Sequence, residues 1–89
     1  MSGHSCFIMY FVYILFSEKA IRYYIGQTNN VEARLTRHNE GRETATKPYV
    51  PWTLVWFVKK ETRAEAMMLE KKLKNLSPSR IKDFIQKYS

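Results

Sequence analysis

Hydrophobic and polar residues are arranged along the chain in a pattern that predicts three strands and three helices. Residues 7–16, FIMYFVYILF, are apolar on both faces and rich in aromatic and β-branched side chains. This composition is typical of a central strand that is covered on both sides. A polar turn at 17–20 leads into IRYYIG at 21–26, which predicts a second strand in a hairpin with the first. WTLVWFV at 52–58 predicts the third strand.

The segments between and after these strands have helical periodicity. Residues 31–41, VEARLTRHNEG, follow two asparagines that can cap a helix and end at a glycine that can stop it. Residues 42–51 contain two prolines and no periodicity, so we expect a loop. A capping-box pattern begins a helix at Thr62 that runs to about Leu76. A serine–proline pair then begins a last helix that ends near Tyr88.

The expected order is therefore β-β-α-β-α-α. Three strands with helices packed on them make a small α/β or α+β domain, with a mixed or antiparallel sheet flanked by helices. We expect one domain over residues 1–89, with 1–6 as a loose lead-in, because 89 residues supply only one core. The first apolar run is shorter than the ~20 residues that span a bilayer. It has no basic residue before it and no cleavage site after it, so we expect neither a signal peptide nor a membrane segment.

The net charge indicates the class of binding partner, and the cysteine content bears on disulfides and zinc sites. The formal net charge is +7, from 15 basic and 8 acidic residues. This excess favours an anionic partner, and nucleic acid is the commonest one; the alternative is a soluble domain that is merely basic. The single cysteine, Cys6, excludes an internal disulfide and suits the cytoplasm. Cys6 has no companions at zinc-ligand spacing.

Two helical residues stand out beside the apolar stripe of the first helix. At 100° per residue, Arg34 and His38 are stacked one turn apart on the flank of the face defined by Val31 and Leu35. One interpretation is a snorkelling arginine and a histidine at the edge of the core. The other interpretation is a functional pair directed along the surface of the sheet.

Polar residues on three further predicted elements also have a structural and a functional interpretation. Glu70 lies at the rim of the buried face of the second helix, where it either pairs with Lys74 or binds a metal. Tyr13 and Tyr24 lie in adjacent strands, and each phenol needs a hydrogen-bond partner if it is buried. Each of them is either a filler of the core or a functional group.

These residues occur in an order and spacing that resembles the GIY-YIG nuclease family. The first signature triplet is Val12-Tyr13-Ile14, and the second is intact as Tyr24-Ile25-Gly26. ARLTRH supplies the helical arginine of the family as Arg34, and the Tyr or His one turn later as His38. EAMMLEKKLK matches the segment that carries the family's metal-binding Glu70. The resemblance covers residues 8 to about 76. Within the family, the chain resembles most the small single-domain members that are related to the nuclease module of bacterial excision-repair endonucleases.

The resemblance implies a fold of order β-β-α-β-α and hydrolysis of phosphodiester bonds with Mg²⁺ or Mn²⁺. It implies that Glu70 is the metal ligand and that Arg34 binds phosphate oxygens. Tyr13 would be a general base or a water-positioning group, and His38 would orient Tyr13 or act as the base itself. Tyr24 would bind the phosphate or the metal-bound water. These residue types suit the reaction, which needs an activated water and a neutralised phosphate.

We expect substrate contacts from five residues near the signature motifs and the second helix: Gly26, Gln27, Arg37, Lys47 and Lys74. Gln27 departs from the repair-type members, which have Lys at this position, and the change removes one phosphate-facing cation. Val12 replaces the first glycine of the family pattern. Trp52, Trp56 and Tyr49 either stack on bases or pack in the core.

Three functions remain open from the sequence. The first is a metal-dependent endonuclease acting on DNA rather than RNA, directed to branched or damaged structures. The second is a nucleic-acid-binding module of the same fold with weak or no catalysis. The third is a protein-interaction domain whose basic surface is incidental. The sequence does not predict the oligomeric state.

Overall fold

A computed structural model describes residues 9–89 of the chain. The strands are β1 (Tyr10–Ser17), β2 (Arg22–Thr28) and β3 (Thr53–Lys60). The helices are α1 (Val31–Asn39), the short 3₁₀ helix η1 (Lys47–Tyr49), α2 (Arg63–Lys74) and α3 (Pro78–Lys87). The order β-β-α-β-α-α agrees with the sequence prediction, apart from the additional 3₁₀ turn in the expected loop.

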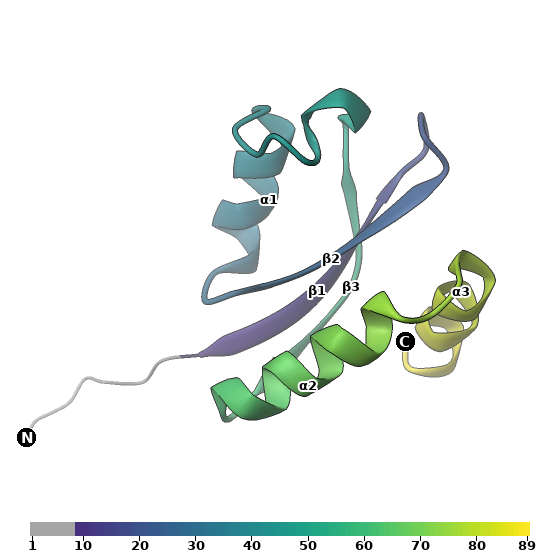
Figure 1. Cartoon of the computed structure of the whole chain (residues 1–89). Coiled ribbons are helices and arrows are strands. Elements are labelled where there is room, and N and C mark those ends of the chain that lie inside the picture. The colour runs from purple at the N-terminus through teal and green to yellow at the C-terminus, as the bar shows by residue number, and fades with distance from the viewer. Residues whose placement is uncertain (1–8) are drawn as a thin grey trace, which may run out of the picture.

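The three strands form one sheet in the order β2-β1-β3, and both pairings are antiparallel. The expected central strand is indeed central, and no parallel pair is present in the described sheet. Helix α1 covers one face, and α2 and α3 cover the other (Figure 1). β2 is therefore an edge strand with a different helix on each side.

Several boundaries differ from the sequence predictions by a few residues. β2 continues past Gly26 to Thr28, because Gln27 and Thr28 still pair with β1. α1 ends at Asn39, and Gly41 follows it with φ 74°. α2 ends at Lys74 rather than Leu76. The predicted start of the first strand at residues 7 and 8 lies outside the described residues.

The N-terminal caps expected from the sequence are present. Thr62 and Glu65 form the reciprocal capping box of α2, and Ser77 caps α3 through the backbone N–H of Arg80. Asn30 caps α1 by accepting a hydrogen bond from the backbone N–H of Ala33 at 3.0 Å. Each cap satisfies a backbone donor that the first helical turn leaves without a partner.

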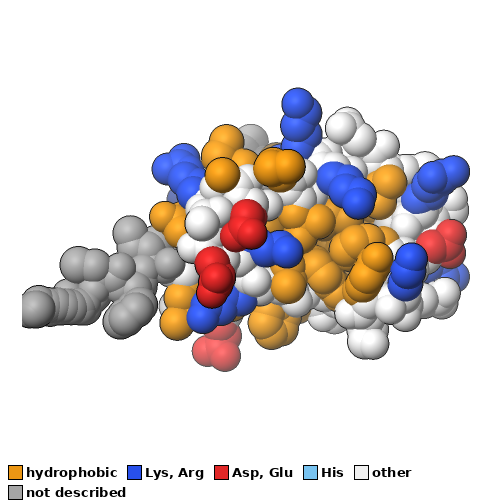
Figure 2. Space-filling model, turned by 90° about the horizontal axis from the view of Figure 1, so that it is seen from below, with side chains coloured by type: hydrophobic (Ala, Val, Ile, Leu, Met, Phe, Trp, Pro, Cys, Tyr) orange, Lys and Arg blue, Asp and Glu red, His pale blue; other side chains and the backbone are white. Residues whose placement is uncertain are grey.

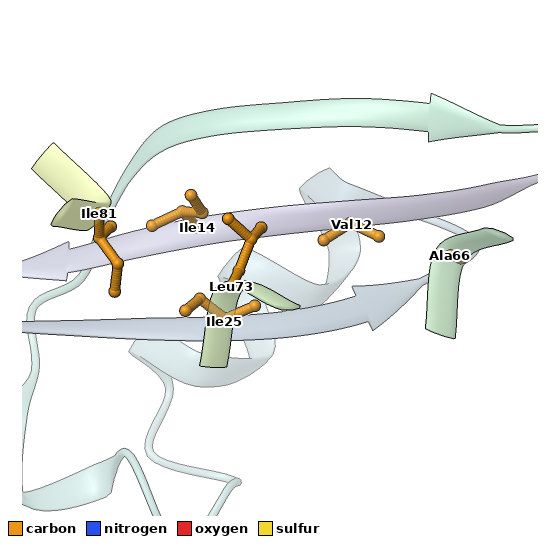
Figure 3. Packing of buried hydrophobic residues seen from close by; sticks show 6 residues of the cluster. All are labelled: Val12, Ile14, Ile25, Ala66, Leu73 and Ile81. Carbon is orange, nitrogen blue, oxygen red and sulfur yellow. The ribbon is translucent and has the colours of Figure 1, made fainter. Parts of the chain in front are cut away.

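The core lies between the sheet and α2–α3. Six buried side chains meet there, from β1, β2 and both helices (Figure 3). They are Val12, Ile14, Ile25, Ala66, Leu73 and Ile81. Alternation along the strands then turns the odd-numbered residues of β1, including Tyr13 and Leu15, to the α1 face. No helix among residues 9–89 is long and apolar enough to cross a membrane.

Leu73 is wholly buried in this core, so its truncation tests the packing of α2 on the sheet. We expect Leu73→Ala to lower the free energy of unfolding by about 2–5 kcal/mol, because it removes buried methyl groups and leaves a cavity. Met68→Ala on the same helix is the control, since Met68 is 73% exposed. Urea unfolding followed by circular dichroism measures both. Equal effects of the two substitutions would contradict the described core.

Candidate active site

The two signature tyrosines lie on the α1 face of the sheet. Tyr13 is directly opposite Gly26 in the β1–β2 pairing, and Tyr24 is opposite Leu15, so both phenols point to the same side. Their ring centroids are 6.3 Å apart in an edge-on arrangement. Tyr13 is only 1% exposed, whereas Tyr24 is half-buried. Tyr24 is therefore the more accessible of the two phenols.

Gly26 is required by the position of the Tyr13 ring. A Cβ atom at residue 26 would lie 2.6 Å from Cζ of Tyr13 and would also overlap its hydroxyl oxygen. Any side chain larger than hydrogen would displace the ring. The glycine of the second signature triplet thus allows the tyrosine of the first triplet to extend across the edge strand.

His38 connects α1 to the central strand β1 through a buried hydrogen bond. Its Nε2 atom lies 2.9 Å from the hydroxyl of Tyr13, and both side chains are 1% exposed. The imidazole also packs against Tyr24, with ring centroids 4.9 Å apart. The other ring nitrogen, Nδ1, lies 2.7 Å from the hydroxyl of Thr46. Both nitrogens of His38 therefore have hydrogen-bond partners within the protein.

Burial sets the protonation of this pair. Burial raises the pKa of the Tyr13 phenol above its usual value of 10.0, the neighbouring Tyr24 adds to this, and Arg34 opposes it. Burial lowers the pKa of the His38 imidazole below its ordinary value of 6.5; Glu43 opposes the shift, while Arg34 and Arg37 reinforce it. At neutral pH the pair is thus a protonated phenol and a neutral imidazole, so the imidazole can accept a hydrogen bond from the phenol.

Arg34 is half-buried on α1, one turn before His38. Its positive charge acts on both members of the pair, because it shifts the pKa of Tyr13 and of His38 downward. The structure thus brings together Tyr13, Tyr24, Arg34 and His38 on the α1 face.

Glu70 belongs to a second group on the opposite face of β2. Gln27 is paired with Val12, so it points toward α2, where its Nε2 donates a hydrogen bond to Oε1 of Glu70 at 3.2 Å. The other oxygen, Oε2, forms an ion pair with Nζ of Lys74 at 2.9 Å. Gln27 and Lys74 thus contact Glu70, and Lys74 forms the i, i+4 pair that the sequence allowed.

Within residues 9–89, no hydrogen bond or ion pair joins the Tyr13–His38 group to the Glu70 group. The two groups meet instead at the edge strand. Tyr24 and Lys74 both line a surface hollow of about 420 Å³, which extends between β2 and the α2–α3 connection. The five residues that the resemblance assigns to catalysis therefore lie in two adjacent groups that share β2.

The remaining predicted substrate residues are spread along the α1 side. Arg37 forms an ion pair with Glu43 at 2.9 Å, so part of its charge is already matched. Lys47 is exposed in η1. Arg22, at the end of the hairpin, places its guanidinium 4.4 Å from the centre of the Tyr49 ring. Trp52 is 4% exposed, so it packs in the core rather than offering a face to a base.

The sequence analysis did not predict that Thr46, Asn39 and Trp52 would lie together behind His38. Thr46 contacts His38, Trp52 donates its indole N–H to the Thr46 carbonyl at 3.0 Å, and Asn39 exchanges two hydrogen bonds with the Trp52 backbone. The 42–51 segment carries no periodicity, so the pattern alone offered no pairing for Thr46. The sequence offered only one hint of this contact, namely that Thr46 follows His38 closely along the chain.

Replacement of Gly26 tests the contact between the two signature triplets. We expect Gly26→Ala to lower the free energy of unfolding by about 1–3 kcal/mol, because the new methyl group overpacks against the Tyr13 ring. In a Tyr13→Leu background the same change should have a smaller effect, since the ring is absent. Thermal unfolding of the four proteins measures the cycle. Equal losses in both backgrounds would show that the two residues are not in contact.

Comparison with known proteins identifies the family of the chain and agrees with its fold. The chain matches the family model described as the GIY-YIG catalytic domain over residues 9–84. It is similar to the solution NMR structure of the UPF0213 protein BH0048 from Bacillus halodurans, with 29% identity and a TM-score of 0.58. That similarity covers 88% of this chain and 83% of the other. No curated protein matches the sequence. Because the family model spans almost the whole chain, this small domain belongs to the GIY-YIG family of nuclease-type catalytic domains.

Proposed function

We propose that the protein is a metal-dependent endonuclease that hydrolyses phosphodiester bonds in DNA. The observation that carries the proposal is the buried hydrogen bond between Tyr13 and His38 beside the accessible Tyr24. Structural roles alone do not require two phenols and an imidazole to converge on the α1 face of the sheet. The GIY-YIG match and the net charge of +7 support a polyanionic substrate.

Within this proposal, Tyr13 and His38 act as an acid–base pair. A neutral imidazole accepts the proton of the Tyr13 hydroxyl while the Tyr13 oxygen takes a proton from the attacking water. The resulting hydroxide forms a bond to phosphorus as the bond to the leaving oxygen breaks, and the leaving oxygen takes a proton from solvent. Tyr24 positions the water or the phosphate, because it is the more accessible ring and contacts both partners.

Arg34 then neutralises the phosphate. Guanidinium groups bind phosphate oxygens through paired hydrogen bonds, and charge that develops in the transition state strengthens that contact. Its electrostatic influence on both Tyr13 and His38 supports a position beside the proposed reacting atoms.

Glu70 is the residue that fits a divalent ion. It forms an ion pair with Lys74 and accepts a hydrogen bond from Gln27, and its side chain is 21% exposed. The described residues contain no cluster of three or more His, Cys, Asp or Glu side chains, so other ligands would be water and phosphate, which Mg²⁺ accepts. When bound, the ion would supply Lewis-acid stabilisation of the phosphate charge. Lys74 is half-exposed and can move away from Oε2 to free that oxygen.

Exposed cations give the protein a surface for the nucleic-acid backbone. Figure 2 shows Lys and Arg side chains spread around a central hydrophobic area on the face of α2 and α3. The exposed basic residues of these helices are Arg63, Lys71, Lys72, Lys74, Arg80, Lys82 and Lys87. Such a surface binds phosphates without sequence preference and with a strong dependence on salt. We propose DNA, with a branched or damaged structure, as the substrate of this cytoplasmic enzyme.

A second candidate is a nucleic-acid-binding module with weak catalysis. One contact favours it: both carboxylate oxygens of Glu70 are already engaged, by Gln27 and by Lys74. In this case the fold would bind DNA but would recruit the metal poorly.

A nicking assay separates the two functions. Supercoiled plasmid, branched DNA and single-stranded DNA are incubated with Mg²⁺ or Mn²⁺, and the products are resolved on gels. We expect the wild type to cleave and Glu70→Gln or Arg34→Ala to lower the rate by roughly 10²-fold or more, since each removes transition-state charge stabilisation. Glu61→Gln is the matched control at an exposed position and should retain activity. Salt-sensitive binding without cleavage by the wild type would support the binding module instead.

The pH dependence of cleavage tests the role of the imidazole. A base must be neutral, and burial lowers the pKa of His38, so the imidazole protonates only below its ordinary value of 6.5. We expect the rate to be level above that pH and to fall as the pH drops below it. The phenol of Tyr13 stays protonated past pH 10, because burial raises its pKa. An acid limb centred above pH 7 under single-turnover conditions would contradict this assignment.

A further inference from the structure

Thr46 occupies a buried position directly behind the imidazole. Its side chain is 1% exposed, and its hydroxyl lies 2.7 Å from Nδ1 of His38. The same hydroxyl lies 3.4 Å from the backbone carbonyl oxygen of Glu43. A hydroxyl has a single proton, so it can donate to only one of these two groups.

The carbonyl of Glu43 can only accept; it receives the backbone N–H groups of Thr46 and Lys47 and lies within reach of the Thr46 hydroxyl. If the Thr46 hydroxyl donates to that carbonyl, its oxygen accepts the proton carried by Nδ1 of His38. The other ring nitrogen, Nε2, is then without a proton and accepts from the Tyr13 hydroxyl. Every buried donor and acceptor in the chain of contacts has a partner in this arrangement.

The opposite tautomer leaves a buried donor without an acceptor. With the proton on Nε2, the imidazole would donate to the Tyr13 oxygen, and the phenol proton would need another acceptor. Among the described residues, the other side chain that hydrogen-bonds with the Tyr13 oxygen is Arg34, whose guanidinium can only donate, so Nε2 of His38 is the acceptor available to the phenol proton. A buried hydroxyl without an acceptor is energetically unfavourable. The low exposure of Tyr13 therefore argues against this tautomer.

We propose that Thr46 is a positioning residue that holds His38 in the tautomer protonated at Nδ1, so that Nε2 is ready to accept the Tyr13 proton. The catalytic consequence rests on the proposed nuclease function, whereas the tautomer itself does not. Thr46 touches neither substrate nor the reacting atoms and acts only through His38.

The surrounding contacts hold Thr46 in this position. Its carbonyl accepts the indole N–H of Trp52 at 3.0 Å. The backbone N–H of Trp52 donates to Oδ1 of Asn39 at 2.6 Å, and Nδ2 of Asn39 donates back to the Trp52 carbonyl at 3.0 Å. Asn39 directly follows His38 on α1. The helix that carries the imidazole therefore also fixes the loop that sets its tautomer.

The experiment measures the tautomer and the kinetics in the same set of variants. Thr46→Val keeps the shape of the side chain but removes the hydroxyl, and Thr46→Ser retains the hydroxyl as the matched control. Long-range ¹⁵N–¹H NMR on protein labelled at histidine distinguishes protonation at Nδ1 from protonation at Nε2. The chain has one other histidine, His4, and a His4→Gln background assigns the signals of His38. Amide spectra of each variant establish that it is folded.

We expect His38 of the wild type and of Thr46→Ser to be protonated at Nδ1, and Thr46→Val to populate the Nε2-protonated form. In cleavage assays we expect Thr46→Val to lower kcat roughly tenfold with KM nearly unchanged, as for loss of an interaction made in the transition state. Thr46→Ser should restore most of kcat.

A wild-type imidazole protonated at Nε2 would overturn the proposal, as would an unchanged tautomer in folded Thr46→Val. Should Thr46→Val be unfolded, the wild-type and Thr46→Ser spectra still decide the tautomer. An Nδ1-protonated His38 in a protein that cleaves no DNA would support the positioning role and reject only the proposed nuclease function.

Discussion

The buried hydrogen bond between Tyr13 and His38 is the contact on which the candidate site depends. It joins the central strand to α1 at 2.9 Å, between two side chains that are each 1% exposed. A polar pair at such depth is tolerated only when every donor and acceptor is matched, and the described residues contain no buried side-chain nitrogen or oxygen without a partner. Gly26 leaves room for the phenol, and Thr46 completes the other side of the imidazole. The position of His38 thus depends on contacts from both signature triplets and from the loop that contains Thr46.

The edge position of β2 explains how a sheet of three strands can present two kinds of chemistry. Alternate side chains of this strand point to α1 and to α2, so Tyr24 joins the phenol–imidazole group and Gln27 contacts Glu70. Because no further strand covers β2 in the described part of the chain, the two groups open to the same edge. A phosphate at that edge would have acid–base chemistry on one side and a carboxylate on the other. In the structure, the cation that contacts this carboxylate is the Lys74 ammonium.

Much of the fold could be predicted from the sequence because local signals agree with the tertiary structure. Three local signals each correspond to an observed element: the capping box at Thr62, the cap at Ser77, and the first strand that is apolar on both faces. The 3₁₀ turn at Lys47–Tyr49 could not be predicted, because a three-residue helix has no periodicity. The end of β2 was placed too early because glycine is usually a strand breaker, whereas here it faces the Tyr13 ring.

The site was predictable as a set of residues but not as an arrangement. The order of Tyr13, Tyr24, Arg34 and His38 was enough to expect proximity, and the structure places the four on the α1 face. Placement of Glu70 on the far side of β2 follows from the pairing register, which the sequence alone did not provide. The contact between Thr46 and His38 joins a helix to an irregular loop, and no spacing rule predicts such a pair.

The central claim is that Tyr13 and His38 act together in cleavage, and a double-mutant cycle on the single-turnover rate tests it most directly. Tyr13→Phe and His38→Gln are measured singly and combined, with Mg²⁺ or Mn²⁺ and a branched DNA substrate. If the two residues pass a single proton, the double variant should be no slower than the slower single variant. Rate losses that multiply in the double variant would show that the two side chains work independently and would contradict the account.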